Sequence, residues 1–275
     1  MSDSLQSLAE THYENFPVGS ILVAKEFRSP IRLVYAFARV ADDIADEGDA
    51  PSSVRLQKLD DWEGEFRESL AGLSDVPFFI ELAEAVKEYS IPSSLFIDLM
   101  AAFKMDAEGR EYPTFADVLA YCSHSANPVG RIVLHIVSHV NDETYRFSDS
   151  ICTALQLTNF WQDLSIDIKR NRLYIPREDL ERFGVTPDAL RNGGTDAIAP
   201  LLKFQVERTK RFFLDGKPLF HLVDARFSFE LRATFHGGMR ILEKIEQLGY
   251  DTTRRRPALS IADWPLIGFR TLLTR

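Results

Sequence analysis

The sequence predicts an all-α protein, and two observations support this prediction. Apolar residues recur every three or four positions along most of the 275-residue chain, as they do on one face of an α-helix. No segment combines sustained alternation of apolar and polar residues with hairpin turns, the pattern typical of strands. With 45% hydrophobic residues and no low-complexity tract, the chain is expected to form one globular domain, or at most two closely merged ones, over residues 1–275, built from about ten or more helices.

Proline, glycine and capping residues predict where the helices begin and end. Pro30 is expected to stop one helix before the next begins, and Thr114 with Asp117 forms a variant of the capping box that opens another. In chain order the expected helices cover residues 4–13, 20–28, 31–47, 52–73, 77–89, 92–106, 114–126, 128–140, 148–170, 197–214 and 227–248, with helical turns near 177–183 and after Pro187, and a tail that contains Trp264 and Phe269.

A polar stripe follows the expected helix 148–170. Gln156, Asn159, Asp163 and Asp167 lie at relative positions 0, 3, 7 and 11, which at about 100° per residue places them within roughly 60° of one another. Apolar residues fill much of the remaining surface, so this helix is expected to be deeply buried. Unpaired charges in a dry core cost several kcal/mol, and a cation is the expected compensation. Amide and carboxylate oxygens suit Mg²⁺, although this stripe alone could equally be a solvated face.

A second polar stripe lies on the expected helix 31–47, and its presence favours a metal site over a solvated face. Tyr35, Arg39, Asp42 and Asp46 occupy relative positions 0, 4, 7 and 11, again on one helical face. Two helices of this kind could face each other across a cavity, where metal ions held by the carboxylates would bind a diphosphate by sharing its oxygens.

The two stripes resemble the paired aspartate motifs of squalene and phytoene synthases, the head-to-head prenyl synthases. The tract Asn171–Pro176 is similar to that family, as is Tyr121-Cys122 followed by Ala126–Gly130. The resemblance covers nearly the whole chain. The bacterial hopanoid-pathway branch, whose members convert presqualene diphosphate to hydroxysqualene, is most similar in the tracts Glu14–Val18, Asp42–Asp49 and Asn159–Asp163.

This resemblance implies an isoprenoid synthase fold, a single helical bundle around a central cavity, with Mg²⁺ as the cofactor. Mg²⁺ would stabilise the leaving diphosphate, the cation would rearrange in a dry aromatic pocket, and water would capture it as hydroxysqualene. The expected metal ligands are Asp42, Asp46, Asp163 and Asp167, with Asn159 as a neutral ligand or neighbour. The expected catalytic residues are Tyr35, Arg39, Gln156 and Tyr174, and the expected substrate-binding residues are Arg39, Tyr121, Gln156, Asn159, Tyr174 and Arg255.

Several of these residues also have ordinary structural interpretations. Arg39 could form a salt bridge with the carboxylates one turn away, and Tyr35 could be a core tyrosine. The basic run 254–256 could be a solvated cluster; Arg255 is the best match to a family arginine that approaches diphosphate. Asp43 lies on a face adjoining the stripe. His135 and His139 have the spacing of zinc ligands, but no glutamate follows His135 and apolar residues surround both, so zinc is not expected.

Two departures from the family pattern bear on the reaction. Gln162 stands where phytoene synthases and many squalene synthases have arginine, and Asn15 replaces a Ser- or His-containing motif. Both fit an enzyme that starts from presqualene diphosphate. The alternatives are a presqualene diphosphate, squalene or phytoene synthase that condenses two prenyl diphosphates, and a non-catalytic relative that serves in binding or assembly.

Composition limits the partners. A formal net charge of −9 argues against nucleic acid and against strong general attraction to an anionic membrane. Cys122 and Cys152 are expected to be buried free thiols in a reducing cytoplasm. The N-terminus lacks the features of a signal peptide, and no stretch approaches a membrane span. The expected location is the cytoplasm. Peripheral contact at the inner membrane face and functional coupling to neighbouring pathway enzymes are both compatible with the sequence.

Overall fold

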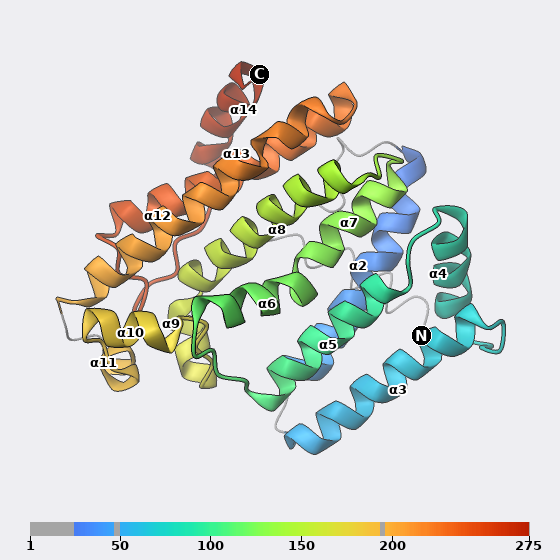
Figure 1. The fold of residues 1–275 in the computed structure, drawn as a ribbon, viewed down its shortest axis with the longest axis horizontal. Coiled ribbons are helices and arrows are strands. Elements are labelled where there is room, and N and C mark those ends of the chain that lie inside the picture. The colour runs from blue at the N-terminus through green and yellow to red at the C-terminus, as the bar shows by residue number, and fades with distance from the viewer. Residues whose placement is uncertain (1–24, 47–49, 193–195, 275) are drawn as a thin grey trace. The chain divides into compact units, whose positions relative to one another are not determined.

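The computed structural model describes residues 25–46, 50–192 and 196–274. Every regular element in these ranges is a helix, and none of these residues forms a strand (Figure 1), so the all-α prediction is confirmed. The chain forms two compact units. The first unit comprises residues up to Glu108 together with Pro128–Asn141, and the second comprises Gly109–Asn127 and Asp142–Arg275. The helices predicted over residues 4–13 and most of 20–28 lie outside the described residues.

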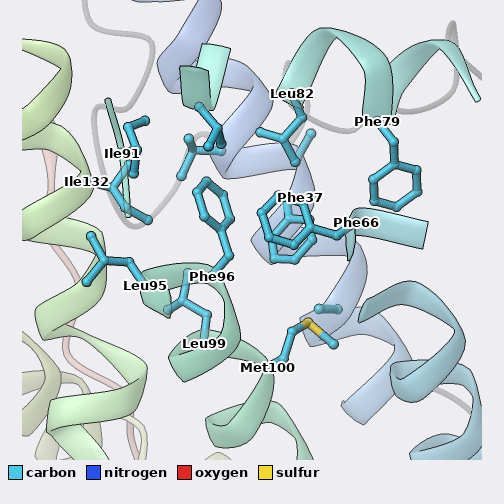
Figure 2. Packing of buried hydrophobic residues seen from close by; sticks show 14 of the residues in the cluster. Phe37, Phe66, Phe79, Leu82, Ile91, Leu95, Phe96, Leu99, Met100 and Ile132 are labelled. Carbon is cyan, nitrogen blue, oxygen red and sulfur yellow. The ribbon is translucent and has the colours of Figure 1, made fainter. Parts of the chain in front are cut away.

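The first unit packs its helices around a cluster of phenylalanines (Figure 2). Phe37, Phe66 and Phe96 come from three different helices, are fully buried, and have ring centroids 4.8–5.3 Å apart. Burying such a ring stabilises the fold by about 1.5–3 kcal/mol, and each ring pair adds about 0.5–1.5 kcal/mol. The helices of this unit are α2 (Lys25–Asp46), α3 (Ser52–Leu70), α4 (Pro77–Glu88), α5 (Ser94–Glu108) and α7 (Asn127–Ile136).

Two predicted boundaries in this unit are wrong. The helix predicted over 128–140 ends at Ile136, because Ser138 takes a positive φ of 60° that no α-helix contains. Helix α2 continues through Pro30 instead of ending there. Pro30 is the sixth residue of the helix, so its missing N–H removes one backbone hydrogen bond near the start, while Pro30 and Ile31 are both buried. Burial of these side chains offsets the lost hydrogen bond, and local sequence signals do not report this compensation.

The second unit is built around α8 (Asp142–Gln162), which packs against α12 (Ile198–Gly216) and α13 (Ala225–Gln247). Trp161 is fully buried and donates from Nε1 to Thr209 Oγ1 at 2.8 Å, which satisfies both polar groups. A Cβ atom at Gly216 would lie 2.9 Å from the backbone oxygen of Phe147. The chain passes so close to α8 at this position that only glycine fits.

The other elements of this unit are shorter and connect these helices. They are α6 (Phe115–Ser125), α9 (Leu164–Asp167), η1 (Ile168–Arg170), α10 (Arg177–Phe183), α11 (Pro187–Asn192), η2 (Lys217–His221), η3 (Ile261–Asp263) and α14 (Trp264–Leu273). The predicted capping box at the start of α6 is confirmed, because the Thr114 side chain accepts from the Asp117 N–H and the Asp117 carboxylate accepts from the Thr114 N–H. Both cysteines are free thiols. The predicted burial is confirmed for Cys122 and wrong for Cys152, which is half-buried.

Candidate active site

The stripe predicted on α2 forms one half-exposed face of that helix. Tyr35, Arg39, Asp42 and Asp46 are all half-exposed, whereas Phe37, about half a turn away around the axis, is completely buried in the phenylalanine cluster. The packing of that cluster therefore fixes the rotation of α2, and this rotation leaves the stripe accessible.

Arg39 joins two carboxylates of this helix. Its Nη1 lies 2.9 Å from Asp42 Oδ2, and its Nη2 lies 2.6 Å from Asp43 Oδ1. The structural interpretation of Arg39 as an ion-pair partner is thus confirmed, and Asp43, from the adjoining face, belongs to the same group. A planar guanidinium suits such a bridge because it presents several N–H donors in a fixed geometry.

The carboxylates of this group outnumber the nearby positive charge. Burial raises the pKa of Asp42 to about 7; the carboxylate of Asp46 adds to the rise, Arg39 opposes it, and Asp43 and Asp106 add further. Asp106, on α5, has no counterpart in either predicted stripe. Its place in the group depends on how α5 packs on α2, and no spacing in the sequence signals this. The group therefore carries more negative than positive charge, and a bound cation would reduce the repulsion among its carboxylates.

The stripe on α8 is also half-exposed, but the helix that carries it is interrupted. Helix α8 ends at Gln162, Asp163 is the residue before α9, and Asp167 ends α9, so the single helix predicted over 148–170 is wrong in its continuity. The Asp163 N–H still donates to Asn159 O at 2.8 Å, and the Asp167 N–H to Asp163 O at 2.9 Å. These bonds keep the helical spacing of the stripe, and Gln156, Asn159, Asp163 and Asp167 are all half-exposed.

A distant segment brings an arginine to this stripe. Arg256 donates from Nε to Asp163 Oδ1, whereas Arg255 is exposed. Gln162 is buried and donates from Nε2 to Pro257 O at 2.7 Å, which holds the residue after Arg256 against the end of α8. Sequence reasoning favoured Arg255; the three consecutive arginines carry no signal that distinguishes one from another.

Four aromatic rings meet in the second unit. Phe160 and Tyr174 stack face to face, with centroids 3.9 Å apart and planes 6° from parallel. Tyr121 lies 5.5 Å from Tyr174, and Tyr112 lies 5.6 Å from both Tyr121 and Tyr174. All four are buried. The structure therefore brings together the predicted Tyr121 and Tyr174 and adds Tyr112, which the sequence did not single out.

Backbone hydrogen bonds hold this cluster in place. The Arg177 N–H donates to Tyr112 O at 2.9 Å, and the Glu178 N–H donates to Pro113 O at 3.0 Å. In return, the Glu178 carboxylate accepts from the Phe115 N–H at 2.7 Å. The first two residues of α10, which follow Tyr174 closely in the chain, are thus joined to the segment that carries Tyr112 at the start of α6.

Within the described residues, no three carboxylate, imidazole or thiol groups converge closely enough to coordinate one ion. Asp42 and Asp163 instead have arginine partners. The α2 stripe belongs to the first unit and the α8 stripe to the second. That the two stripes face each other across a cavity therefore stays a prediction.

The family is decided by comparison with known proteins. The model of the squalene/phytoene synthase family matches residues 9–263. The chain belongs to the squalene/phytoene synthase family. It is similar to a hydroxysqualene synthase of Rhodopseudomonas palustris, with 34% identity over 75% of this chain and 70% of that protein. It is also similar to a phytoene synthase of Mycobacterium tuberculosis, with 30% identity over 80% of this chain and 74% of that protein.

Solved structures support the same assignment. The crystal structure of squalene synthase HpnC from Alicyclobacillus acidocaldarius matches with a TM-score of 0.84 and 37% identity, over 90% of this chain and 94% of that one. A dehydrosqualene synthase bound to a ligand matches with a TM-score of 0.83 at 19% identity, which bears on the fold alone. The protein therefore has the squalene synthase type of isoprenoid synthase fold, and it is an enzyme of the prenyl synthase type.

Proposed function

We propose that this enzyme converts presqualene diphosphate and water to hydroxysqualene and diphosphate, with Mg²⁺ as its cofactor. The observation that supports this best is the pair of half-exposed carboxylate stripes, in a chain 34% identical to one hydroxysqualene synthase and 37% identical to another, from Zymomonas mobilis. Keeping two sets of adjacent carboxylates costs stability, because like charges one turn apart repel each other. A site that must bind cations and diphosphate accounts for that cost.

The residues present fit a magnesium–diphosphate site. Asp42, Asp46, Asp163 and Asp167 would hold the metal, with Asn159 as a neutral oxygen ligand. When bound, Mg²⁺ supplies Lewis-acid stabilisation of the negative charge that develops on the leaving diphosphate. Arg39 and Arg256 already contact carboxylates of the two stripes, and their guanidinium groups suit the diphosphate oxygens that would approach the same carboxylates.

The remaining site residues act on the hydrocarbon part of the reaction. The carbon–oxygen bond to diphosphate breaks with both electrons leaving on oxygen, and a water oxygen then bonds to the rearranged cation and loses a proton. The buried rings of Tyr112, Tyr121, Phe160 and Tyr174 exclude bulk water and present electron-rich faces that stabilise positive charge. Tyr35 and Gln156, at the other ends of the stripes from the last aspartates, are proposed to orient the capturing water.

The second candidate reaction is condensation of two prenyl diphosphates, as in presqualene diphosphate, squalene or phytoene synthases. The 30% identity with the Mycobacterium tuberculosis phytoene synthase favours it. Gln162 opposes it, because the neutral side chain at this position is buried and bonded to Pro257 O, so it adds no positive charge for a second diphosphate. Arg256 contributes one charge at the α8 stripe, which matches one diphosphate better than two.

Product identification separates the two candidates. The purified protein with Mg²⁺ is given presqualene diphosphate in one reaction, farnesyl diphosphate in a second and geranylgeranyl diphosphate in a third. Hydroxysqualene from the first substrate and little turnover of the other two are expected, without a nicotinamide cofactor. Presqualene diphosphate formed efficiently from farnesyl diphosphate, or phytoene from geranylgeranyl diphosphate, would assign the enzyme to the corresponding condensing branch. Asp42→Asn serves as the inactive control.

The proposed location is the cytoplasm, with peripheral contact at the inner face of the membrane. In the part of the chain that the structure describes, no helix has the length and apolar character needed to cross a bilayer. The proposed substrate and product each carry a hydrocarbon chain too apolar to diffuse freely in water, so transfer to neighbouring pathway enzymes is expected to take place at a membrane surface.

A further inference from the structure

The C-terminal helix α14 exposes an unusual set of apolar side chains. Trp264, Phe269, Leu272 and Leu273 are 55–71% exposed, and Ile261, in the turn just before the helix, is 89% exposed. Single exposed leucines are normal on protein surfaces, whereas a contiguous group that includes a tryptophan and a phenylalanine marks an interaction surface.

These side chains share one face of the helix. At about 100° per residue, Trp264, Leu272, Phe269 and Leu273 lie within an arc of about 180°. Ile267 is buried on the opposite side, where α14 packs on α13 (Figure 1). The exposed arc contains no charged residue. We call this face, together with Ile261, the C-terminal apolar face.

Ionic contacts hold α14 firmly on α13. The carboxylate of Asp263 is buried, with Arg240 Nε at 2.7 Å and Lys244 Nζ at 2.8 Å. Arg270, the charged residue of α14, pairs with Glu243, and Arg232 Nη1 donates to Thr274 O at 2.6 Å. The C-terminal apolar face is thus a fixed surface rather than the side of a loosely attached tail.

The same part of the chain is locally basic. Residues 225–275 contain nine basic and five acidic side chains, a net of +4, in a chain whose formal net charge is −9. The net positive charge of this C-terminal stretch contrasts with the acidic remainder of the chain and favours an anionic surface as its partner.

We propose that the C-terminal apolar face docks on an anionic lipid bilayer, with Trp264 and Phe269 at the level of the headgroups. Five exposed residues offer on the order of 700 Å², somewhat less than the roughly 800 Å² per partner of a stable dimer. A bilayer needs no matching partner surface, because each inserted side chain and each nearby basic group adds to the affinity. The choice of lipid also rests on the proposed function, whose substrate and product are hydrocarbons that dissolve in bilayers.

Binding to vesicles without substrate tests this proposal separately from catalysis. The protein is sedimented with vesicles of phosphatidylglycerol and phosphatidylethanolamine, and with vesicles of phosphatidylcholine alone. The test variant is Phe269→Ser/Leu272→Ser/Leu273→Ser. The matched control is Leu73→Ser/Leu214→Ser, which removes two leucines that are 76% and 55% exposed on other helices or turns. A fall in affinity for anionic vesicles of about tenfold or more is expected in the test variant only.

Tryptophan fluorescence gives a second measurement. Among the three tryptophans, Trp161 is fully buried and Trp62 is half-buried, so Trp264 is the one whose emission should move to shorter wavelength on anionic vesicles. Trp264→Phe should bind but lose this shift. Wild-type protein that fails to bind, or a triple variant that binds as well as wild type, would overturn the proposal. A dimer in light scattering that the triple variant abolishes would show that a second copy covers the face instead. Failure of the proposed reaction alone would leave vesicle binding unchanged.

Discussion

Arg256 donates a hydrogen bond from Nε to the carboxylate of Asp163, although the two residues are 93 positions apart in the chain. The contact depends on two further bonds, Thr252 Oγ1 to Trp161 O at 2.6 Å and Gln162 Nε2 to Pro257 O at 2.7 Å, which fix residues 252–257 against the end of α8. Residues 252–257, which form no regular secondary structure, are thus held beside Asp163. Gln162 anchors this segment through its hydrogen bond to Pro257 O.

Arg256 and Arg255 make a matched pair for testing this contact. Arg256→Gln should lower kcat/KM by about 10- to 100-fold, because a charge-assisted hydrogen bond is worth about 1.5–3 kcal/mol. Arg255→Gln, the same change at an exposed neighbour, should alter it less than threefold, as expected of about 0.5 kcal/mol or less. Steady-state kinetics on presqualene diphosphate measures both. Equal losses in the two variants would show that the charge of the whole basic run matters, not the contact with Asp163.

Mg²⁺ and diphosphate should together stabilise the folded protein. At concentrations about 100-fold above Kd, the gain is about 2.7 kcal/mol, equivalent to an increase in Tm of about 5 °C or more. Differential scanning fluorimetry measures this increase for wild type and for Asp42→Ala/Asp163→Ala. The double variant should show no increase. If it responds as wild type does, the metal binds elsewhere, and catalysis that survives exhaustive chelation would rule out the magnesium mechanism itself.

Tyr112 should affect the product rather than binding of the diphosphate. Tyr112→Phe keeps the ring and should leave the reaction unchanged within about twofold. Tyr112→Leu removes the ring beside Tyr121 and Tyr174, so the buried cation loses part of its aromatic surroundings. We expect a larger share of by-products and a lower kcat with little change in KM, measured by product analysis. A rise in KM with an unchanged product ratio would instead indicate a general loss of structure.

Gly216 should be intolerant of a side chain. Gly216→Ala places a Cβ 2.4 Å from Ile151 Cγ1 and 2.9 Å from Phe147 O, and backbone has little room to move in a packed interior. A loss of about 1–3 kcal/mol in the free energy of unfolding is expected from urea titration. Gly268→Ala is the control, because no atom lies within 4 Å of its added Cβ. That variant should be neutral, or up to about 1 kcal/mol more stable through helix propensity.

The attachment of α14 should depend on pH in a defined direction. Burial raises the pKa of Asp263, but hydrogen bonds from Lys244, from the Ser260 backbone and from Arg240 outweigh it and lower the pKa overall. A lowered folded-state pKa gives stability that is present above the unfolded value, about 3.9, and is lost as the pH falls below it. Asp263→Asn should therefore be less stable than wild type from pH 7 to 5, with the difference shrinking below about pH 4. A constant difference across this range would show that the carboxylate charge contributes nothing.

The spacing of apolar and polar residues along the chain predicted most of the helices and the two polar stripes of the candidate site. Apolar residues at intervals of three and four predict helices because this spacing repeats the helical turn, and the same geometry places Tyr35, Arg39, Asp42 and Asp46 on one face. A helix buries its apolar face. A polar stripe on an otherwise apolar helix therefore indicates side chains that stay accessible to solvent or ligand. The sequence by itself therefore determined the helical class, the two stripes and the family they resemble.

Only the tertiary structure decided which distant residues join those stripes. Asp106 joins the α2 stripe through the packing of α5 on α2, and two hydrogen bonds at the end of α8 hold the segment that brings Arg256 to the α8 stripe. Tyr112 joins Tyr121 and Tyr174 through hydrogen bonds between the segment before α6 and the first residues of α10. Likewise, Pro30 continues a helix that local rules would end, because buried side chains offset one missing bond. Periodicity describes neighbours one turn apart, whereas these contacts depend on long-range packing, whose energy no short stretch of sequence contains.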